Sequence, residues 1–371
     1  NGTISVTAYD ATTGILALSG SDTKSNYASV LRSVKYENTN TENPDTTDRS
    51  LSWTVNDGTT DSTAVVYTIK ISANNDPPAL TLGTTTTQSF TEGGSAINLD
   101  TSASVAISDA DNANMASAKV VISSSTLTGS EDVLGFTDTA TITGSYDSNT
   151  GTLTLTGSDT IASYVAALKT VTYLNSNTAN PSTTTRSLSW TVNDGTTDST
   201  AVTTTISVAG VNDPPILSLV SSTMAYTEGA AATDVAAGPQ IVDTDSTNLS
   251  WARVQITGNL KNTEDVLAAT STTTIIANYN ATSGLLELAG SDTKASYAAA
   301  LATVTYQNTN TTTPDTNTRT LTWTLSDGTD TNTSPPTSTI TITAQNDAPT
   351  FSLSGLTYSP VSYTHLRAHE T

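Results

Sequence analysis

The chain has 371 residues, roughly enough for two or three domains with buried cores, and its 13% of charged residues and abundance of Thr, Ser, Val and Ile favour strands and turns over helices. Its formal net charge of -21 argues against nucleic acids and anionic membranes as partners but is compatible with cations. The absence of cysteine excludes disulfides and thiolate ligands, and no apolar run reaches the roughly 20 residues of a membrane span.

The chain is an array of repeats of about 135 residues. The segment SLSWTVNDGTTDSTAV occurs at 50–65 and again, unchanged, at 187–202, and a looser copy begins at Thr320. Each copy closes on an Asn-Asp pair followed by proline or Ala-Pro. We therefore predict the truncated C-terminal part of a first repeat, two complete repeats and the start of a further repeat, at 1–76, 77–213, 214–347 and 348–360, respectively.

A short helix is predicted in the segment SDTIASYVAALKTVTY of the first complete repeat. Tyr164, Leu168 and Val171 have the spacing of one helix face, and Ser158 or Asp159 would cap the start of the helix. The recurrent GSD motif ahead of it has no phosphate-loop spacing and suits the same cap. A strand should follow the helix from around Val171.

The rest of the repeat has the signals of strands. The segment LSWTV at 188–192 alternates apolar and polar residues, as a strand with one buried face does. Asp194 and Gly195 then suit a tight hairpin, which leads into TAVTTTISV as the returning strand. We therefore predict an all-β fold of tandem immunoglobulin-like β-sandwich repeats, each with one short helix.

An ordered set of motifs carries a family resemblance. TEG occurs at 91–93 and 227–229, and it is followed by DAD or DTD, EDVL, the pattern YxxxxGxLxLxGSD, RxLxWTxxDG and a closing NDPP. This set resembles the bacterial cadherin-like tandem repeats, which occur in very large secreted adhesins and RTX-type surface proteins. The resemblance covers residues 1–360. It implies cadherin-like β-sandwich repeats with calcium at the junctions between neighbours.

The resemblance also implies the ligands. An early acidic residue, the Asn-Asp linker and the Asp-x-Asp of the next repeat would hold the ion, because calcium prefers six to eight oxygen ligands. At the only complete junction these are Glu92, Asn212, Asp213, Asp243 and Asp245. Two incomplete junctions retain Asn75, Asp76, Asp109 and Asp111 in one case, and Glu228, Asn346 and Asp347 in the other.

Two points leave the calcium interpretation open at this stage. Asp and Asn also favour turns without any ion. In addition, Pro214 follows Asp213, whereas cadherin linkers usually carry a further Asn there, so the number of ions per junction is open.

Other candidate residues have structural interpretations. Adjacent acids such as Glu131 and Asp132 should point to opposite faces of a strand, and a nucleophilic triad is excluded in 1–360 because His and Cys are absent. Trp251 has no equivalent in the other copies and is a weak candidate for ligand contact. We expect core packing for the recurrent tryptophans and pairing with a carboxylate for the recurrent arginines, which are Trp53, Trp190 and Trp323, and Arg49, Arg186 and Arg319.

The tail SYTHLRAHET, at 362–371, holds the only two histidines, His365 and His369. Their spacing suits a zinc pair on a helix, but Leu366 stands where zinc proteases have Glu, and no Cys or further His completes the ligand set. The tail departs from the composition of the preceding residues and resembles a translated sequencing-library adapter. We therefore predict that 361–371 is an inert artefact of a truncated metagenomic reading frame.

Together these features predict a non-catalytic stalk of a bacterial extracellular surface protein, stiffened by calcium, that carries an adhesive end domain. Its expected partners are neighbouring repeats of the same chain and a cell-surface or glycan target reached through other domains, with no nucleic acid and no membrane insertion. Two alternatives stay open. The repeats could be glycan- or protein-binding modules that gain avidity by repetition, or an accessory region of a secreted enzyme.

Overall fold

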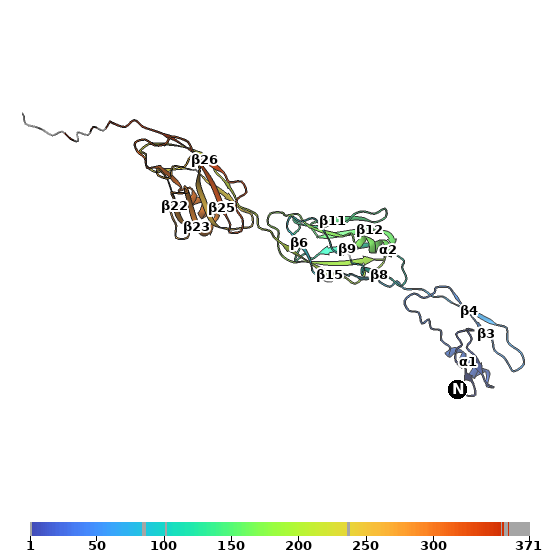
Figure 1. Cartoon of the computed structure of the whole chain (residues 1–371). Helices are drawn as coiled ribbons and strands as arrows, with labels where there is room; N and C mark the ends of the chain where they lie inside the picture. Colours follow the sequence, from blue (N-terminus) through green and yellow to red (C-terminus); the bar gives the residue numbers. More distant parts are fainter. Residues whose placement is uncertain are drawn as a thin grey trace, which may run out of the picture. The chain divides into compact units, whose positions relative to one another are not determined.

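The computed structural model describes residues 2–83, 87–100, 102–235 and 238–349, together with Phe351 and Gly355. The chain divides into two compact units, one made of 1–90, 94–176 and 183–208 and the other of 91–93, 177–182 and 209–371. Both consist mainly of strands with few helices, which confirms the predicted all-β class (Figure 1). The tail at 361–371 and its two histidines lie outside the described residues, and the predicted repeat boundaries stay a prediction.

Residues 79–209 form a β-sandwich. One sheet has six strands in the order β11-β12-β9-β14-β15-β6, and a three-stranded sheet, β10-β13-β7, and the pair β5-β8 complete it. The strands are β5 (Ala79–Thr81), β6 (Gln88–Thr91), β7 (Ile97–Asn98), β8 (Ala106–Ser108), β9 (Asn114–Ile122), β10 (Asp132–Gly135), β11 (Thr143–Asp147), β12 (Thr152–Thr160), β13 (Thr172–Asn175), β14 (Arg186–Asn193) and β15 (Val202–Ala209).

Residues 216–343 repeat the same strand order. The six-stranded sheet is β17-β26-β25-β20-β23-β22, accompanied by β18-β24-β21 and the pair β16-β19, and β17 runs parallel to β26. The strands are β16 (Ile216–Ser218), β17 (Thr223–Thr227), β18 (Thr233–Asp234), β19 (Gln240–Val242), β20 (Asn248–Gly258), β21 (Asp265–Ala268), β22 (Ile276–Asn280), β23 (Leu285–Thr293), β24 (Thr305–Asn308), β25 (Arg319–Ser326) and β26 (Thr337–Thr343).

The N-terminal segment carries copies of the same strands without a core. It contains β1 (Ser5–Val6) paired with β2 (Leu18–Ser19), helix α1 (Lys24–Ser33), and β3 (Arg49–Trp53) paired with β4 (Val65–Ile69). None of the described residues between 2 and 77 is buried.

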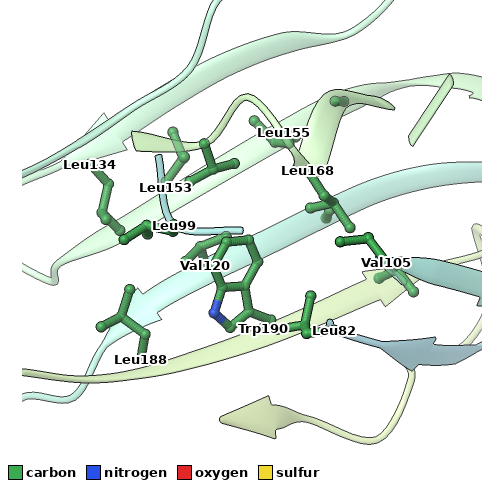
Figure 2. Packing of buried hydrophobic residues seen from close by; sticks show 14 of the residues in the cluster. Leu82, Leu99, Val105, Val120, Leu134, Leu153, Leu155, Leu168, Leu188 and Trp190 are labelled. Atoms are coloured by element: carbon green, nitrogen blue, oxygen red, sulfur yellow. The ribbon is translucent and has the colours of Figure 1, made fainter. Parts of the chain in front are cut away.

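Each sandwich has a hydrophobic core centred on a tryptophan. Along β14, buried and partly exposed residues alternate, and Leu188 and Trp190 face the core (Figure 2). Val192 on the same strand is also fully buried. The Trp190 Nε1–H donates to Thr204 Oγ1 at 2.9 Å, so burial leaves no indole nitrogen without a partner. Trp323 is likewise fully buried and donates to Ser338. The predicted core role is confirmed for both residues, whereas Trp53 is partly exposed.

The predicted helix is present, but its cap differs from the prediction. Helix α2 (Ile161–Leu168) begins after Thr160, whose hydroxyl accepts a hydrogen bond from the Ser163 N–H. Ser158 and Asp159 do not cap it, because the helix begins directly after Thr160, the last residue of β12, and Asp159 Oδ1 accepts the N–H of Thr160 at 2.7 Å. The equivalent helix α3 (Lys294–Leu301) is capped by Thr293 in the same way.

The GSD motif marks a bulge in a strand and not a helix cap. The pairing of β12 with β9 shifts between Thr156 and Asp159, and Gly157 lies in this irregularity with φ +136°. A Cβ at Gly157 would lie 1.9 Å from the carbonyl oxygen of Thr141. Glycine is therefore required both by the backbone conformation and by the close approach of the neighbouring chain.

Gly157→Ala is expected to cost about 1–3 kcal/mol more stability than Gly195→Ala. Both glycines have positive φ, at 136° and 107°, but a Cβ at Gly195 meets its nearest neighbour, the Ala116 Cβ, at an ordinary 3.6 Å. The difference between the variants therefore isolates the steric overlap with Thr141. Urea denaturation of the first unit measures it, and equal midpoints for the two variants would contradict this role of Gly157.

The turn at Asp194-Gly195 is longer than the predicted tight hairpin. Asn193 pairs with Asp198, and the Asn193 Nδ2 donates to Asp198 Oδ1 at 2.6 Å, which closes a turn of four residues. Asp194 Oδ1 accepts the backbone N–H groups of Thr196 and Thr197 at 2.6 and 2.7 Å. These side-chain acceptors replace the backbone bonds of a two-residue hairpin.

The recurrent arginines pair with carboxylates, as predicted, but the partner is buried only for Arg186 and Arg319, whereas Arg49 lies 3.8 Å from the exposed Asp45. Arg186 Nε lies 2.9 Å from Asp132 Oδ1, and both side chains are fully buried. The expectation that Glu131 and Asp132 point to opposite faces is wrong, because Glu131 Oε2 lies 3.6 Å from Nη2 of the same Arg186. Asp132 is the first residue of β10, so Glu131 belongs to the turn before the strand. In the second unit Arg319 and Asp265 form the equivalent pair at 2.9 Å.

No helix in the described ranges has the length and apolar character needed to cross a membrane.

Candidate metal centre

Asn212, in the linker at 211–215, forms hydrogen bonds with a turn that is distant in the sequence. Asn212 Nδ2 donates to Asp327 Oδ2 at 2.8 Å and to Asp330 Oδ2 at 2.9 Å. Both aspartates belong to the turn between β25 and β26, which carries the recurrent Asp-Gly pair. One amide group therefore lies between two carboxylates and fixes this turn to the linker within the second compact unit.

Asp213 contacts the Asp-x-Asp segment at 243–245. The Asp213 N–H donates to Asp245 Oδ2 at 3.0 Å, and the Thr244 hydroxyl donates to Asp213 Oδ2 at 3.2 Å. Asp243 Oδ1 accepts the Ser246 N–H at 2.8 Å. The structure thus brings the predicted Asn212, Asp213 and Asp-x-Asp residues together around one linker.

Glu92 and Glu228 occupy equivalent positions directly after β6 and β17. Glu92 Oε2 accepts the Val211 N–H at 2.7 Å, and Glu228 Oε2 accepts the Gln345 N–H at 2.6 Å. Each carboxylate therefore binds the residue that precedes an Asn-Asp pair. At the last linker, Asn346 Nδ2 donates to the backbone carbonyl of Asp347 at 3.4 Å.

The linker at 74–78 repeats this arrangement in the first unit. Asn75 Nδ2 donates to Asp194 Oδ2 at 2.7 Å, and the Asp76 N–H donates to Asp111 Oδ2 at 3.3 Å. Asp109 Oδ1 accepts the N–H groups of Asp111 and Asn112 at 3.1 and 2.8 Å.

Several carboxylate oxygens of these residues are buried without a hydrogen-bond partner. Seven buried side-chain polar atoms in the described part of the chain lack one. One is Arg319 Nη2 in the second core, and the other six are carboxylate oxygens of predicted ligands: Asp76 Oδ2, Glu92 Oε1, Asp109 Oδ2, Glu228 Oε1, Asp243 Oδ2 and Asp245 Oδ1. A buried carboxylate oxygen without a donor is costly, and a bound cation removes that cost.

Burial and neighbouring carboxylates raise the pKa of two of the predicted ligands, Asp243 and Asp109. Burial raises the pKa of the Asp243 carboxyl, and the carboxylates of Asp245 and Asp327 add to the rise, although the Ser246 N–H opposes it. Burial likewise raises the pKa of Asp109, with a further contribution from Asp111. Both shifts reflect carboxyl groups that are buried and lie close to further acids.

The donor set fits calcium, but its side chains are not arranged as a preformed metal centre. Carboxylate, amide and backbone oxygens are the ligands that calcium prefers. Among the residues that the structure describes, no three or more His, Cys, Asp or Glu side chains are grouped as a metal centre needs. At 211–215 the carboxylates bond instead to N–H groups, so ion binding there requires some of them to turn away from these donors.

Sequence reasoning missed the contribution of two loops. It treated the Asp-Gly pairs as hairpin turns, whereas Asp194 and Asp327 lie against Asn75 and Asn212. It also passed over the asparagine-rich loop before β14, where Asn180 Nδ2 donates to the Thr244 carbonyl at 2.9 Å. The recurrence of Asp-Gly at the same register in three copies was the signal available for the first loop.

The Arg253 side chain covers one face of the Trp251 ring, so this face is not available for sugar stacking. The ring is partly buried on β20, and the Arg253 guanidinium carbon lies 4.1 Å from its centroid. Arg253 also pairs with Glu287 at 2.7 Å, which holds the guanidinium in place.

Comparison with known proteins finds likenesses in structure alone. No protein-family model matches the chain. No curated protein matches it either. Among solved structures, human protocadherin-24 repeats EC1-2 match at 10% identity and a TM-score of 0.28, over 72% of this chain and all of that one.

Two further structures match at a similar level. Mouse cadherin-23 repeats EC22-24 match at 14% identity and a TM-score of 0.29, over 73% of this chain and 67% of that one. Protocadherin gamma B2 extracellular cadherin domains 3-6 match at 12% identity and a TM-score of 0.31, over 92% of this chain and 65% of that one. Scores this low do not assign the chain to a family or a function.

Proposed function

We propose that this chain is a stalk segment of a bacterial extracellular adhesin, in which calcium bound at the linkers stiffens the connection between cadherin-like repeats. The six buried carboxylate oxygens without partners carry this proposal, since all belong to residues that the motif resemblance implies as calcium ligands. The protein acts mechanically and catalyses no reaction. Its partners are neighbouring repeats of the same chain, and end domains reach the cell-surface or glycan target.

The residues around 211–215 have a direct part in this function. Asp213, Asp243 and Asp245, together with Asp327, supply carboxylate oxygens, and Glu92 supplies one from the end of β6. Asn212 and backbone carbonyls supply neutral oxygens once the amide turns. Calcium neutralises the mutual repulsion of the carboxylates and joins the linker to the Asp-x-Asp segment and the Asp-Gly turn.

The same reasoning applies to the linker at 74–78 with a smaller ligand set. Asn75, Asp76, Asp109 and Asp111 gather there with Asp194, and the unpaired oxygens of Asp76 and Asp109 are the counterparts of those at the second linker. Glu228 and its unpaired Oε1 supply the early acidic ligand for the linker at 345–349. The function therefore repeats along the chain with each linker.

Asp243→Asn is expected to weaken calcium binding at one site by at least about tenfold, because calcium affinity depends on the number of charged ligands. Asp243 is only 7% exposed and holds an unpaired oxygen, so its loss removes a central ligand. Isothermal titration of the whole chain with calcium, after removal of ions by a chelator, measures the change.

Asp234→Asn is the matched control. It makes the same change of charge at an exposed position on β18, which pairs with β24, and should leave the affinity unchanged. Calcium binding by Asp243→Asn as tight as that of the wild type would count against the proposed site, and absence of binding by the wild type would overturn the function.

A further inference from the structure

The turn that follows β14 in the first sandwich and β25 in the second differs in the position of one aspartate. The sequences are NDGTTDS at 193–199 and SDGTDTN at 326–332, so Thr197-Asp198 in the first corresponds to Asp330-Thr331 in the second. Each turn thus contains two aspartates, but the second of them is moved by one residue.

This move changes the contact that the aspartate makes. In the first sandwich Asp198 Oδ1 accepts the Asn193 Nδ2 at 2.6 Å and closes its own turn. In the second sandwich Asp330 Oδ2 instead accepts the Asn212 Nδ2 at 2.9 Å and faces the linker. The equivalent Thr197 also faces its linker, since its hydroxyl accepts the Asn75 Nδ2–H at 3.3 Å, so a carboxylate at this position of the turn reaches the linker asparagine.

The two linker asparagines consequently lie in different surroundings. Asn212 Nδ2 donates to two carboxylates, those of Asp327 and Asp330, at 2.8 and 2.9 Å. Asn75 Nδ2 donates to one carboxylate, Asp194 at 2.7 Å, and to the Thr197 hydroxyl at 3.3 Å. A position within hydrogen-bond distance of two carboxylate oxygens is favourable for a cation, and in this structure the amide fills it.

A second observation indicates a ligand at the same place. Asp243 is 93% buried, since its exposed fraction is 7%, and its Oδ2 has no hydrogen-bond partner. Asp243 belongs to the same group of contacts, because the neighbouring Thr244 donates to Asp213 Oδ2 at 3.2 Å and Asp213 directly follows Asn212. Lys294 does not neutralise these acids directly, because its Nζ donates to the backbone carbonyls of Asp243 and Ser246.

We propose that Asp330 is an additional calcium ligand, which makes the linker at 211–215 bind calcium more tightly than the linker at 74–78. This inference rests on the proposed calcium function. For the ion to bind, Asn212 turns its amide nitrogen away and releases the oxygens of Asp327 and Asp330. The first linker has a hydroxyl at this position, so it has one anionic ligand fewer.

Because of this difference in affinity, the two linkers bind calcium at different concentrations. As the calcium concentration rises, the linker with Asp330 fills first and becomes stiff, while the linker at 74–78 still bends. A one-residue difference in an exposed turn therefore sets the calcium concentration at which each linker stiffens.

A reciprocal pair of variants tests the role of Asp330. Asp330→Thr gives the second turn the residue of the first, and Thr197→Asp gives the first turn the residue of the second. Both positions are exposed turn residues, so both variants should fold, which far-UV circular dichroism checks. Isothermal titration of the whole chain with calcium chloride, at low ionic strength, measures the affinities.

Asp330→Thr is expected to weaken the tightest calcium site by about tenfold, and Thr197→Asp to tighten a weaker site by about the same factor. Calcium binding by the wild type with unchanged affinities in Asp330→Thr would overturn the role of Asp330 and leave the proposed function in place. No calcium binding by the wild type would overturn both.

Discussion

Asp265→Ala is expected to lower the free energy of unfolding of the second unit by about 3–5 kcal/mol. Asp265 and Arg319 are both fully buried, and Asp265 Oδ2 lies 2.9 Å from the Arg319 Nε. The Tyr306 hydroxyl also donates to Asp265 Oδ1 at 2.6 Å. Removal of the carboxylate leaves a buried guanidinium and a buried hydroxyl without their main acceptor.

Urea denaturation in the presence of a chelator measures this loss without a contribution from calcium. Glu287→Ala is the control, because Glu287 forms an exposed pair with Arg253, with side chains 38% and 42% exposed. Its loss should cost less than about 1 kcal/mol. A cost below 1 kcal/mol for Asp265→Ala as well would contradict a structural role for the buried pair.

Calcium is expected to raise the free energy of unfolding by about 2.7 kcal/mol for each occupied site at a free concentration one hundred times the dissociation constant. The physical reason is that the unfolded chain does not gather the carboxylates of Asp213, Asp243 and Asp245, so the ion binds the folded state alone. Thermal unfolding of the whole chain in calcium and in chelator measures the shift.

Magnesium provides the control for this experiment. It requires near-octahedral geometry and releases its water reluctantly, so an equal concentration should raise the melting temperature less than calcium does. Equal melting temperatures in calcium, magnesium and chelator would contradict binding at the linkers.

The parts of the fold that depend on local pattern could be predicted from the sequence. The alternation in LSWTV correctly predicts β14 and the burial of Trp190, because alternate residues of a strand share one face and the apolar face packs into the core. The helix at Ile161–Leu168 was also predicted, since its apolar residues follow the helical period. Both features depend on residues within a few positions of each other.

The errors concern features that depend on a distant partner. The bulge at Gly157 arises from the register of β12 against β9 and from the approach of Thr141, neither of which the motif GSD reveals. The cap is Thr160 because β12 runs through that residue and the helix begins directly after it, at Ile161. Local propensity alone could not separate a strand end from a helix start here.

The candidate site could be predicted only in part. The motif resemblance supplied Asn212, Asp213 and the two aspartates of Asp-x-Asp, which the structure brings together. It did not supply Asp327 or Asp330, because their contact with Asn212 joins residues 115 and 118 positions apart. An Asp-Gly pair has a sufficient explanation as a turn, and only the three-dimensional position of that turn gives it a second role.

Small-angle X-ray scattering of the whole chain, in calcium and in chelator, tests the central claim most directly. We expect a larger maximum dimension and a narrower range of conformations in calcium, because neutralised linkers stop bending. Asp243→Asn should shift this change to higher calcium concentrations. Superimposable scattering profiles in calcium and in chelator, at saturating calcium, would contradict a calcium-stiffened stalk.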